Sequence, residues 1–202
     1  MARRSAPDVN AGSMADIAFL LLIFFLVTTT IDTDRGISRK LPPPLDETVE
    51  PPIIKQKNVF VVEVNKNNDL LVEEVPMELK DLRAAAIEFL DNGGGVGSEA
   101  CDFCQGAKDP SSSDNPVKAV ISLRNNRETS YSTYIAVQNE LVAAYNELRN
   151  RESQRLYGKS FIQMEEELKD VLYSGSKDRL KEQIKNIQMM FPEKLSEAEP
   201  KK

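Results

Sequence analysis

The chain contains no histidine and only two cysteines among its 202 residues. Histidine is the commonest acid–base group and metal ligand, and a structural zinc site needs about four nitrogen or sulfur ligands. The sequence also shows no nucleophile paired with a base. We therefore predict that the protein is not an enzyme and that it holds neither a metal ion nor a cofactor.

The sequence also lacks an excess of basic residues. Its 26 Lys and Arg residues are outnumbered by 32 Asp and Glu residues, which gives a formal net charge of -6. Near the amino terminus Arg3 and Arg4 balance Asp8 and Asp16, so the net negative charge lies in the remainder of the chain. Nucleic-acid binding needs clustered Lys and Arg, and we expect no nucleic-acid partner.

One stretch is strongly apolar, because every residue from 17 to 27 is apolar. A helix rises about 1.5 Å per residue and the hydrocarbon layer is roughly 30 Å thick, so about 20 residues are needed to cross it. Extension beyond residue 31 meets Asp32 and Asp34, whereas residues 11–15 are small or apolar. We predict a transmembrane helix over residues 11–31, in which the hydroxyls of Thr28 to Thr30 bond back to their own helix.

Asp16 lies more than one turn inside this predicted helix. Burying an ionised carboxylate there costs several kcal/mol, so the group should either be paired or take up a proton. Reversible protonation would make Asp16 a proton carrier. Two other interpretations stay open. Asp is a good N-cap and would then mark the helix start. Alternatively, the basic Arg3 and Arg4 and the apolar run would form a cleaved secretory signal, although no A-x-A-like site follows.

The segment around Asp16 resembles the amino-terminal region of the ExbD/TolR family, membrane proteins that pair with ExbB/TolQ-type proton channels to drive TonB- or Tol-type machines. Asn10 takes the family's Asn position, Asp16 its essential Asp, and residues 24–28 its closing run. Gly12 and Ser13 stand where the family usually has Thr and Pro. The resemblance implies that Asp16 carries protons within a membrane motif that also contains Asn10, Ser13, Thr28 and Thr30.

The same resemblance implies partners and a location. The expected partners are an ExbB/TolQ-like multi-helix membrane protein, a TonB-like energy transducer and a second copy of this chain. Basic residues on the two sides of the predicted helix nearly balance, and the resemblance decides the orientation. It implies a single-pass protein of the bacterial inner membrane, with residues 1–10 as a cytoplasmic tail and the carboxyl-terminal domain in the periplasm.

Residues 32–57 are predicted to be a proline-rich periplasmic linker, since LPPP at 41–44 and PP at 51–52 bracket an acidic run. Proline fixes φ and removes a donor, so the segment should be extended and span up to about 80 Å. Leu41 and Pro42 lie where the family commonly has Leu-Pro, and the resemblance implies that this segment rearranges in the active motor. A passive tether is the alternative.

Residues 58–150 are predicted to form a small α+β domain. A hairpin is expected from strands at 59–64 and 70–72, followed by a helix at 78–90 with Pro76 as a start signal, a strand at 117–123 and a long helix from Tyr131. This β-β-α-β-α order resembles the periplasmic domain of the family. Residues 151–202 are predicted to be a helical extension with helices near 161–173 and 178–190, and residues 191–196 are expected to supply the displaced last strand.

An insertion at 93–116 is rich in Gly, Ser and Asp, which favours a mobile loop. Its Cys101 and Cys104 do not have the strand and helix context of a redox active site. A local disulfide or two free thiols is expected. The Ser, Thr and Tyr hydroxyls and the dispersed charges elsewhere in the chain are interpreted as solvated surface.

The sequence therefore predicts an ExbD-like subunit of a proton-motive-force-driven motor that energises TonB-dependent outer-membrane transport. A TolR-like subunit for envelope maintenance is one alternative. The other is a signal-anchored periplasmic module that binds peptidoglycan or a protein, in which Asp16 only caps the helix.

Overall fold

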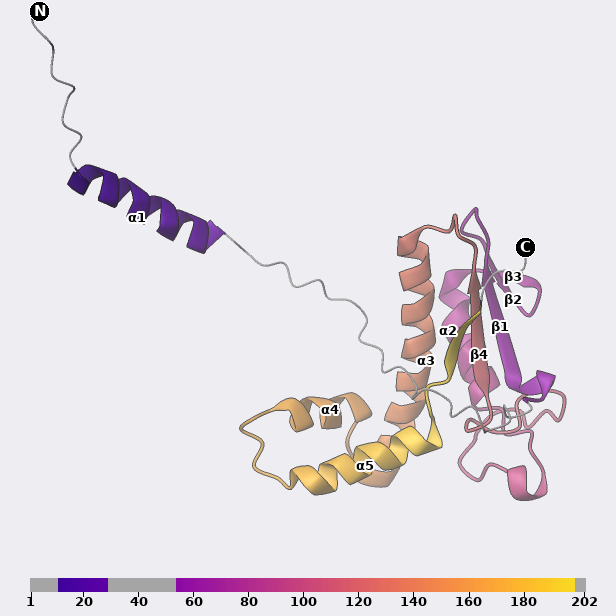
Figure 1. Cartoon of the computed structure of the whole chain (residues 1–202). Coiled ribbons are helices and arrows are strands. Elements are labelled where there is room, and N and C mark those ends of the chain that lie inside the picture. Colours follow the sequence, from indigo (N-terminus) through magenta and orange to yellow (C-terminus); the bar gives the residue numbers. More distant parts are fainter. Residues whose placement is uncertain (1–10, 29–53, 199–202) are drawn as a thin grey trace, which may run out of the picture. The chain divides into compact units, whose positions relative to one another are not determined.

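The computed structural model describes residues 11–28 and 54–198 (Figure 1). The chain divides into two compact units, Met1–Glu50 and Pro51–Lys202. The predicted tail at 1–10, most of the predicted linker, and the motif residues Asn10, Thr30, Leu41 and Pro42 lie outside the described residues.

In the first unit, helix α1 runs over Ala11–Thr28. It begins at the residue where the sequence predicts a start. Within the described part of the chain, no helix combines the length and the apolar character that a membrane crossing requires. The transmembrane role of residues 11–31 therefore stays a prediction.

The second unit is built on a five-stranded mixed sheet of order β3-β2-β1-β4-β5. Its strands are β1 (Val59–Val64), β2 (Leu70–Val72), β3 (Val75–Met77), β4 (Val120–Asn125) and β5 (Leu195–Ala198). The three amino-terminal strands form an antiparallel meander, whereas β4 runs parallel to both β1 and β5. The predicted hairpin and the displaced last strand are confirmed, and β5 begins four residues later than expected.

Strand β3 is an element that the sequence pattern does not predict. Its Pro76, which the pattern marks as a helix start signal, lies in the edge strand of the sheet, where proline's missing donor is tolerated. The turn between β2 and β3 consists of Glu73 and Glu74, both with positive φ. A two-residue hairpin turn of this kind normally carries Asn or Gly, so the turn residues gave no signal.

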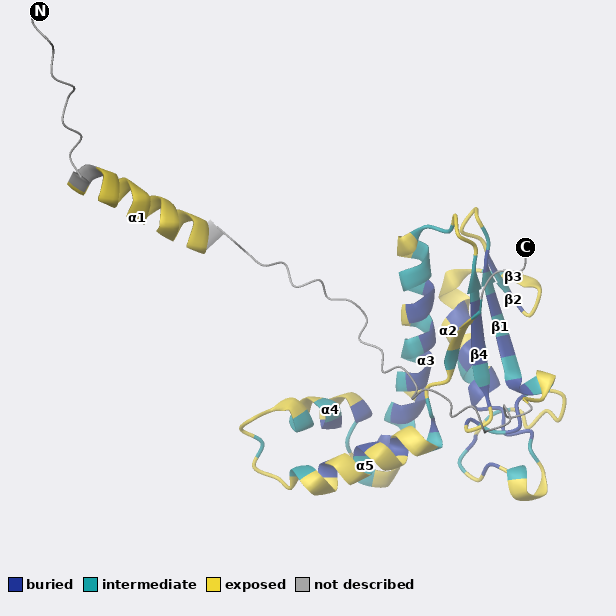
Figure 2. Cartoon of the chain, viewed as in Figure 1, coloured by how far each residue is buried: buried dark blue, intermediate teal, exposed yellow. Residues whose placement is uncertain are grey.

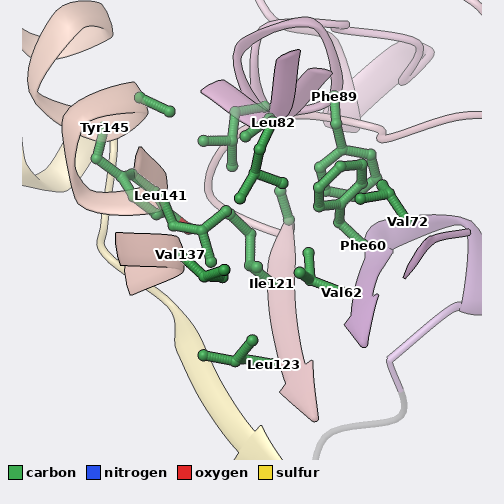
Figure 3. Close-up of a cluster of buried hydrophobic side chains, with 14 of the residues drawn as sticks. Phe60, Val62, Val72, Leu82, Phe89, Ile121, Leu123, Val137, Leu141 and Tyr145 are labelled. Carbon is green, nitrogen blue, oxygen red and sulfur yellow. The ribbon is translucent and has the colours of Figure 1, made fainter. Parts of the chain in front are cut away.

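Helices α2 (Leu79–Leu90) and α3 (Tyr131–Tyr157) cover one face of the sheet (Figure 1). Burial alternates along β1, so that Phe60, Val62 and Val64 face the helices while the residues between them stay partly exposed. Figure 3 shows this core, in which the strand side chains meet Leu82 of α2 and Leu141 of α3. Burying such apolar side chains is the main driving force for this unit.

The extension after α3 belongs to the same unit. Helix α3 ends at Gly158, whose φ of 69° is the left-handed conformation that suits glycine at a helix end. Helices α4 (Phe161–Lys169) and α5 (Lys177–Met190) form a small apolar cluster of their own beside the end of α3, and the chain then returns to the sheet as β5. Serines at 160 and 176 cap the two helices by accepting a backbone N–H bond.

The insertion between α2 and β4 makes many internal contacts. Its Cys101 and Cys104 form a disulfide, and both residues are buried. The Asn92 side chain donates to the carbonyl groups of Asp109 and Ser113 and accepts from the Asp109 N–H. The glycines of this segment allow close backbone approach, because a Cβ on Gly94 would collide with the backbone oxygen of Asp109. These contacts tie parts of the insertion to one another, and its mobility stays a prediction.

Candidate functional site

Helix α1 places Asp16 at its sixth position, beyond the first turn. An N-cap side chain precedes the first helical residue, so the position of Asp16 does not fit a cap. The prediction that this carboxylate lies more than one turn inside the helix is confirmed. It is also the only charged residue between positions 11 and 28.

The surface of α1 is apolar all round. The described large side chains of this helix are exposed (Figure 2), from Met14 to Leu26. Apart from Asp16, the described side chains of this helix therefore show no polar face. Along the helical period, Phe19, Leu20 and Ile23 share the face of Asp16. Ser13 and Thr28 lie within α1, and their side chains are not among those described.

A second cluster of charges surrounds Asp114, in the insertion. Its carboxylate is 2% exposed and lies 2.6 Å from the Lys57 ammonium and 3.4 Å from that of Lys55. Asn58 donates its side-chain amide to Asp114 at 3.0 Å and accepts from the Asp114 backbone N–H at 2.7 Å. Desolvation opposes ionisation of this carboxyl, but the bonds from Lys57, Asn58 and Lys55 outweigh it and hold its pKa well below its usual range.

Glu99 extends this cluster on the exposed side. It accepts from Lys118 and, at 3.0 Å, from Lys55. These bonds, with that from Lys118 the larger, lower the pKa of the Glu99 carboxyl. The insertion therefore holds the segment Lys55–Asn58, through which the chain enters the domain, by two carboxylates that stay ionised at neutral pH.

A third set of charges lies on the carboxyl-terminal third of α3. Arg151 makes a two-pronged contact with Asp91 at the end of α2, at 2.6 and 2.8 Å. Glu152 is fully buried and accepts from Arg151 at 3.3 Å and from Arg155 at 2.7 Å. Each buried acid thus has a guanidinium partner, which is the condition for burying charge without a large cost.

Arg149 joins α3 to the chain after α5. Its guanidinium donates twice to the Phe191 carbonyl, at 3.0 and 2.8 Å, and lies 5.4 Å from the Phe161 ring of α4. Burial lowers the pKa of this guanidinium. The bonds to the carbonyl and the aromatic contact fix the α4–α5 extension against the body of the domain.

The interpretation of the charges outside the insertion as solvated surface is wrong for Asp91, Arg149 and Glu152, because these three residues are buried. Glu152 and Arg155 lie three residues apart on one helix face, and this local spacing by itself favours an ion pair. Asp114 and Lys57 are far apart in the sequence, and no local pattern joins them. Among the described residues, no group of three or more His, Cys, Asp or Glu side chains is placed to hold a metal ion.

These features define a class of protein, a small α+β domain that follows an apolar helix bearing one carboxylate. The chain belongs to the family described as Biopolymer transport protein ExbD/TolR, which it matches over residues 2–151. Members of this family are subunits of motors that energise biopolymer transport, and they work in a complex with ExbB/TolQ-like partners. No curated protein matches the chain. The family match ends within α3, so α4, α5 and β5 lie beyond it.

Proposed function

We propose that this chain is the ExbD-like subunit of a proton-motive-force-driven motor of the bacterial inner membrane, and that Asp16 is its proton carrier. The observation that carries the proposal is the position of Asp16, a lone charged residue beyond the first turn of a helix that is apolar all round. Membership of the ExbD/TolR family supports it. In this role residues 11–31 span the membrane and the domain lies in the periplasm.

The chemistry follows from the charge of one carboxyl group. A protonated Asp16 tolerates an apolar lining, whereas the carboxylate requires water or hydroxyl groups nearby. Loading and unloading of the proton on Asp16 therefore changes which surface of a neighbouring helix is preferred by α1. One helix cannot form a closed path for protons, so an ExbB/TolQ-like protein supplies the other wall, with a second copy of this chain beside it.

The domain would transmit the movement of α1 towards the outer membrane. A TonB-like energy transducer is the partner expected for the domain, and the subunit itself carries out no enzymatic reaction. A TolR-like role uses the same proton chemistry with different outer partners. An anchored binding module for peptidoglycan or a protein, with Asp16 as a cap, is disfavoured by the position of Asp16 inside α1.

The test is Asp16→Asn in the full chain, expressed with its multi-helix partner. Asn keeps the size of the side chain and removes its titration, so we expect TonB-dependent uptake and proton leak to be lost. Asp34→Asn, the same change outside the predicted span, is the matched control and should leave both intact. Normal uptake and leak with Asn at position 16 would contradict the mechanism.

A second experiment separates the motor from an anchored module. Residues 1–31 are replaced by an unrelated signal anchor, which should abolish activity in a motor and preserve it in a binding module. Loss of envelope integrity with unchanged TonB-dependent uptake in the Asp16→Asn strain would assign the chain to the TolR-like role.

A further inference from the structure

The insertion contacts two segments that lie far apart in the sequence. One is the segment that enters the domain, Lys55–Asn58. The other is the turn at Phe191, where the chain leaves α5 towards β5. Phe191 belongs to the main core of the domain, and Phe103 packs against that core.

The first contact is ionic. Asp114 binds Lys57 and Asn58, and Glu99 binds Lys55. The Lys57 ammonium also donates to the Pro110 carbonyl at 3.0 Å. Three separate positions of the insertion thus hold the incoming segment just before β1.

The second contact is aromatic. Phe103 lies between the two cysteines, and its ring meets that of Phe191 edge to face with 5.3 Å between centroids. Phe191 is fully buried, and its carbonyl accepts from Arg149. The position of Phe103 depends on the disulfide, because the bridge closes the tight loop that carries this ring.

The disulfide is packed into the body of the insertion. Cys104 lies against Gly93, and its N–H donates to the Cys101 sulfur at 3.1 Å. Reduction removes the covalent closure of the loop that carries Phe103.

We propose that the insertion is a redox-sensitive brace that fastens the incoming segment 55–58 and the segment leading into β5 to one another while the Cys101–Cys104 bond is intact. A dithiol opens the brace. The dithiol transfers two electrons and two protons, so that the S–S bond becomes two thiols and the dithiol becomes a disulfide. Both fastened segments then loosen together. This inference concerns the domain alone and holds whether or not Asp16 carries protons.

The experiment is hydrogen exchange of the full chain in detergent, compared before and after treatment with dithiothreitol. We expect exchange to rise about tenfold in peptides covering residues 55–60 and 191–197, with no change in α2. The double variant Cys101→Ser, Cys104→Ser should reproduce the reduced pattern. Asp102→Asn, at the exposed residue beside the bridge, is the matched control and should exchange like the oxidised chain.

Two further variants test each contact alone. Phe103→Ala should loosen residues 191–197 and leave 55–60 unchanged, whereas Asp114→Asn should do the reverse. A rise on reduction that is confined to residues 96–108 would overturn the proposal. A rise spread equally over α2 and the sheet would also overturn it, since it would mean general unfolding.

Discussion

Asp16 and Glu152 are both carboxylates inside helices, but their surroundings differ. Glu152 is fully buried between Arg151 and Arg155, so its charge is balanced where it lies. Asp16 belongs to a helix with no other charged residue. A balanced acid holds a structure together, whereas the proposed function gives Asp16, with no opposite charge on its own helix, a role in proton transfer. Asp114 is a structural acid of the same kind as Glu152, because Lys55 and Lys57 balance its charge.

The largest effect on stability is expected from Glu152→Ala. The change removes a fully buried side chain and leaves Arg155 without its acid, although Arg151 keeps its bonds to Asp91. We expect the free energy of unfolding to fall by about 2 to 3 kcal/mol, measured by chemical denaturation. Glu166→Ala, an exposed position on α4, is the control and should change it by less than about 0.5 kcal/mol. If the two changes lowered the free energy of unfolding equally, the buried Glu152 would not contribute more to stability than an exposed acid.

An intermediate effect is expected for Asp114, and it should depend on pH. The native pKa of this carboxyl lies below its usual value of 3.8, so the unfolded chain takes up the proton more readily. The stabilisation is therefore complete at neutral pH and is lost as the pH falls below about 4. Asp114→Asn should cost about 1 to 2 kcal/mol at pH 7, and the difference from the unaltered chain should shrink as the solution is acidified.

The control for this pH dependence is Asp102→Asn, an exposed acid of the same insertion. It should leave the unfolding free energy at pH 7 unchanged. If the Asp114→Asn difference grew on acidification instead, Lys55 and Lys57 would not be stabilising the ionised carboxylate.

The smallest effect on stability is expected from Asp16→Asn. Because Asp16 lies in the unit Met1–Glu50 and the domain in the unit Pro51–Lys202, the unfolding of the domain should change by less than about 0.5 kcal/mol. Thermal unfolding followed by near-ultraviolet circular dichroism checks this. A shift of the melting temperature by several degrees would show that Asp16, like Glu152, contributes to the stability of the domain.

Local patterns predicted most of the elements of the domain. Alternation marks β1, and the apolar spacing and Gly158 mark α3 and its end. The boundaries shifted where the local signal was weak, as at β4, which begins at Val120 and not at residue 117. Strand β3 was missed because its turn residues and Pro76 are atypical of a strand.

The clusters of buried charge could not be predicted in the same way. Asp91 and Arg151 lie 60 residues apart, and Asn58 and Asp114 lie 56 apart. A lone Asp or Lys in a polar stretch has the same neighbours in the sequence whether its side chain is solvated or forms a buried ion pair in the folded domain. The glycines at 93–95 were equally ambiguous, because the residue that permits mobility also permits tight packing.

The sequence by itself determined the helix around Asp16, the hairpin, the two helices that cover the sheet and the family, because each depends on the order of neighbouring residues. Only the tertiary structure decided that the insertion contacts both the segment 55–58 and Phe191, that the α4–α5 extension is fixed by Arg149, and that Asp91, Asp114, Arg149 and Glu152 are buried. The physical reason is that periodicity acts within a few residues, whereas ion pairs and ring contacts form only after the chain has folded back on itself.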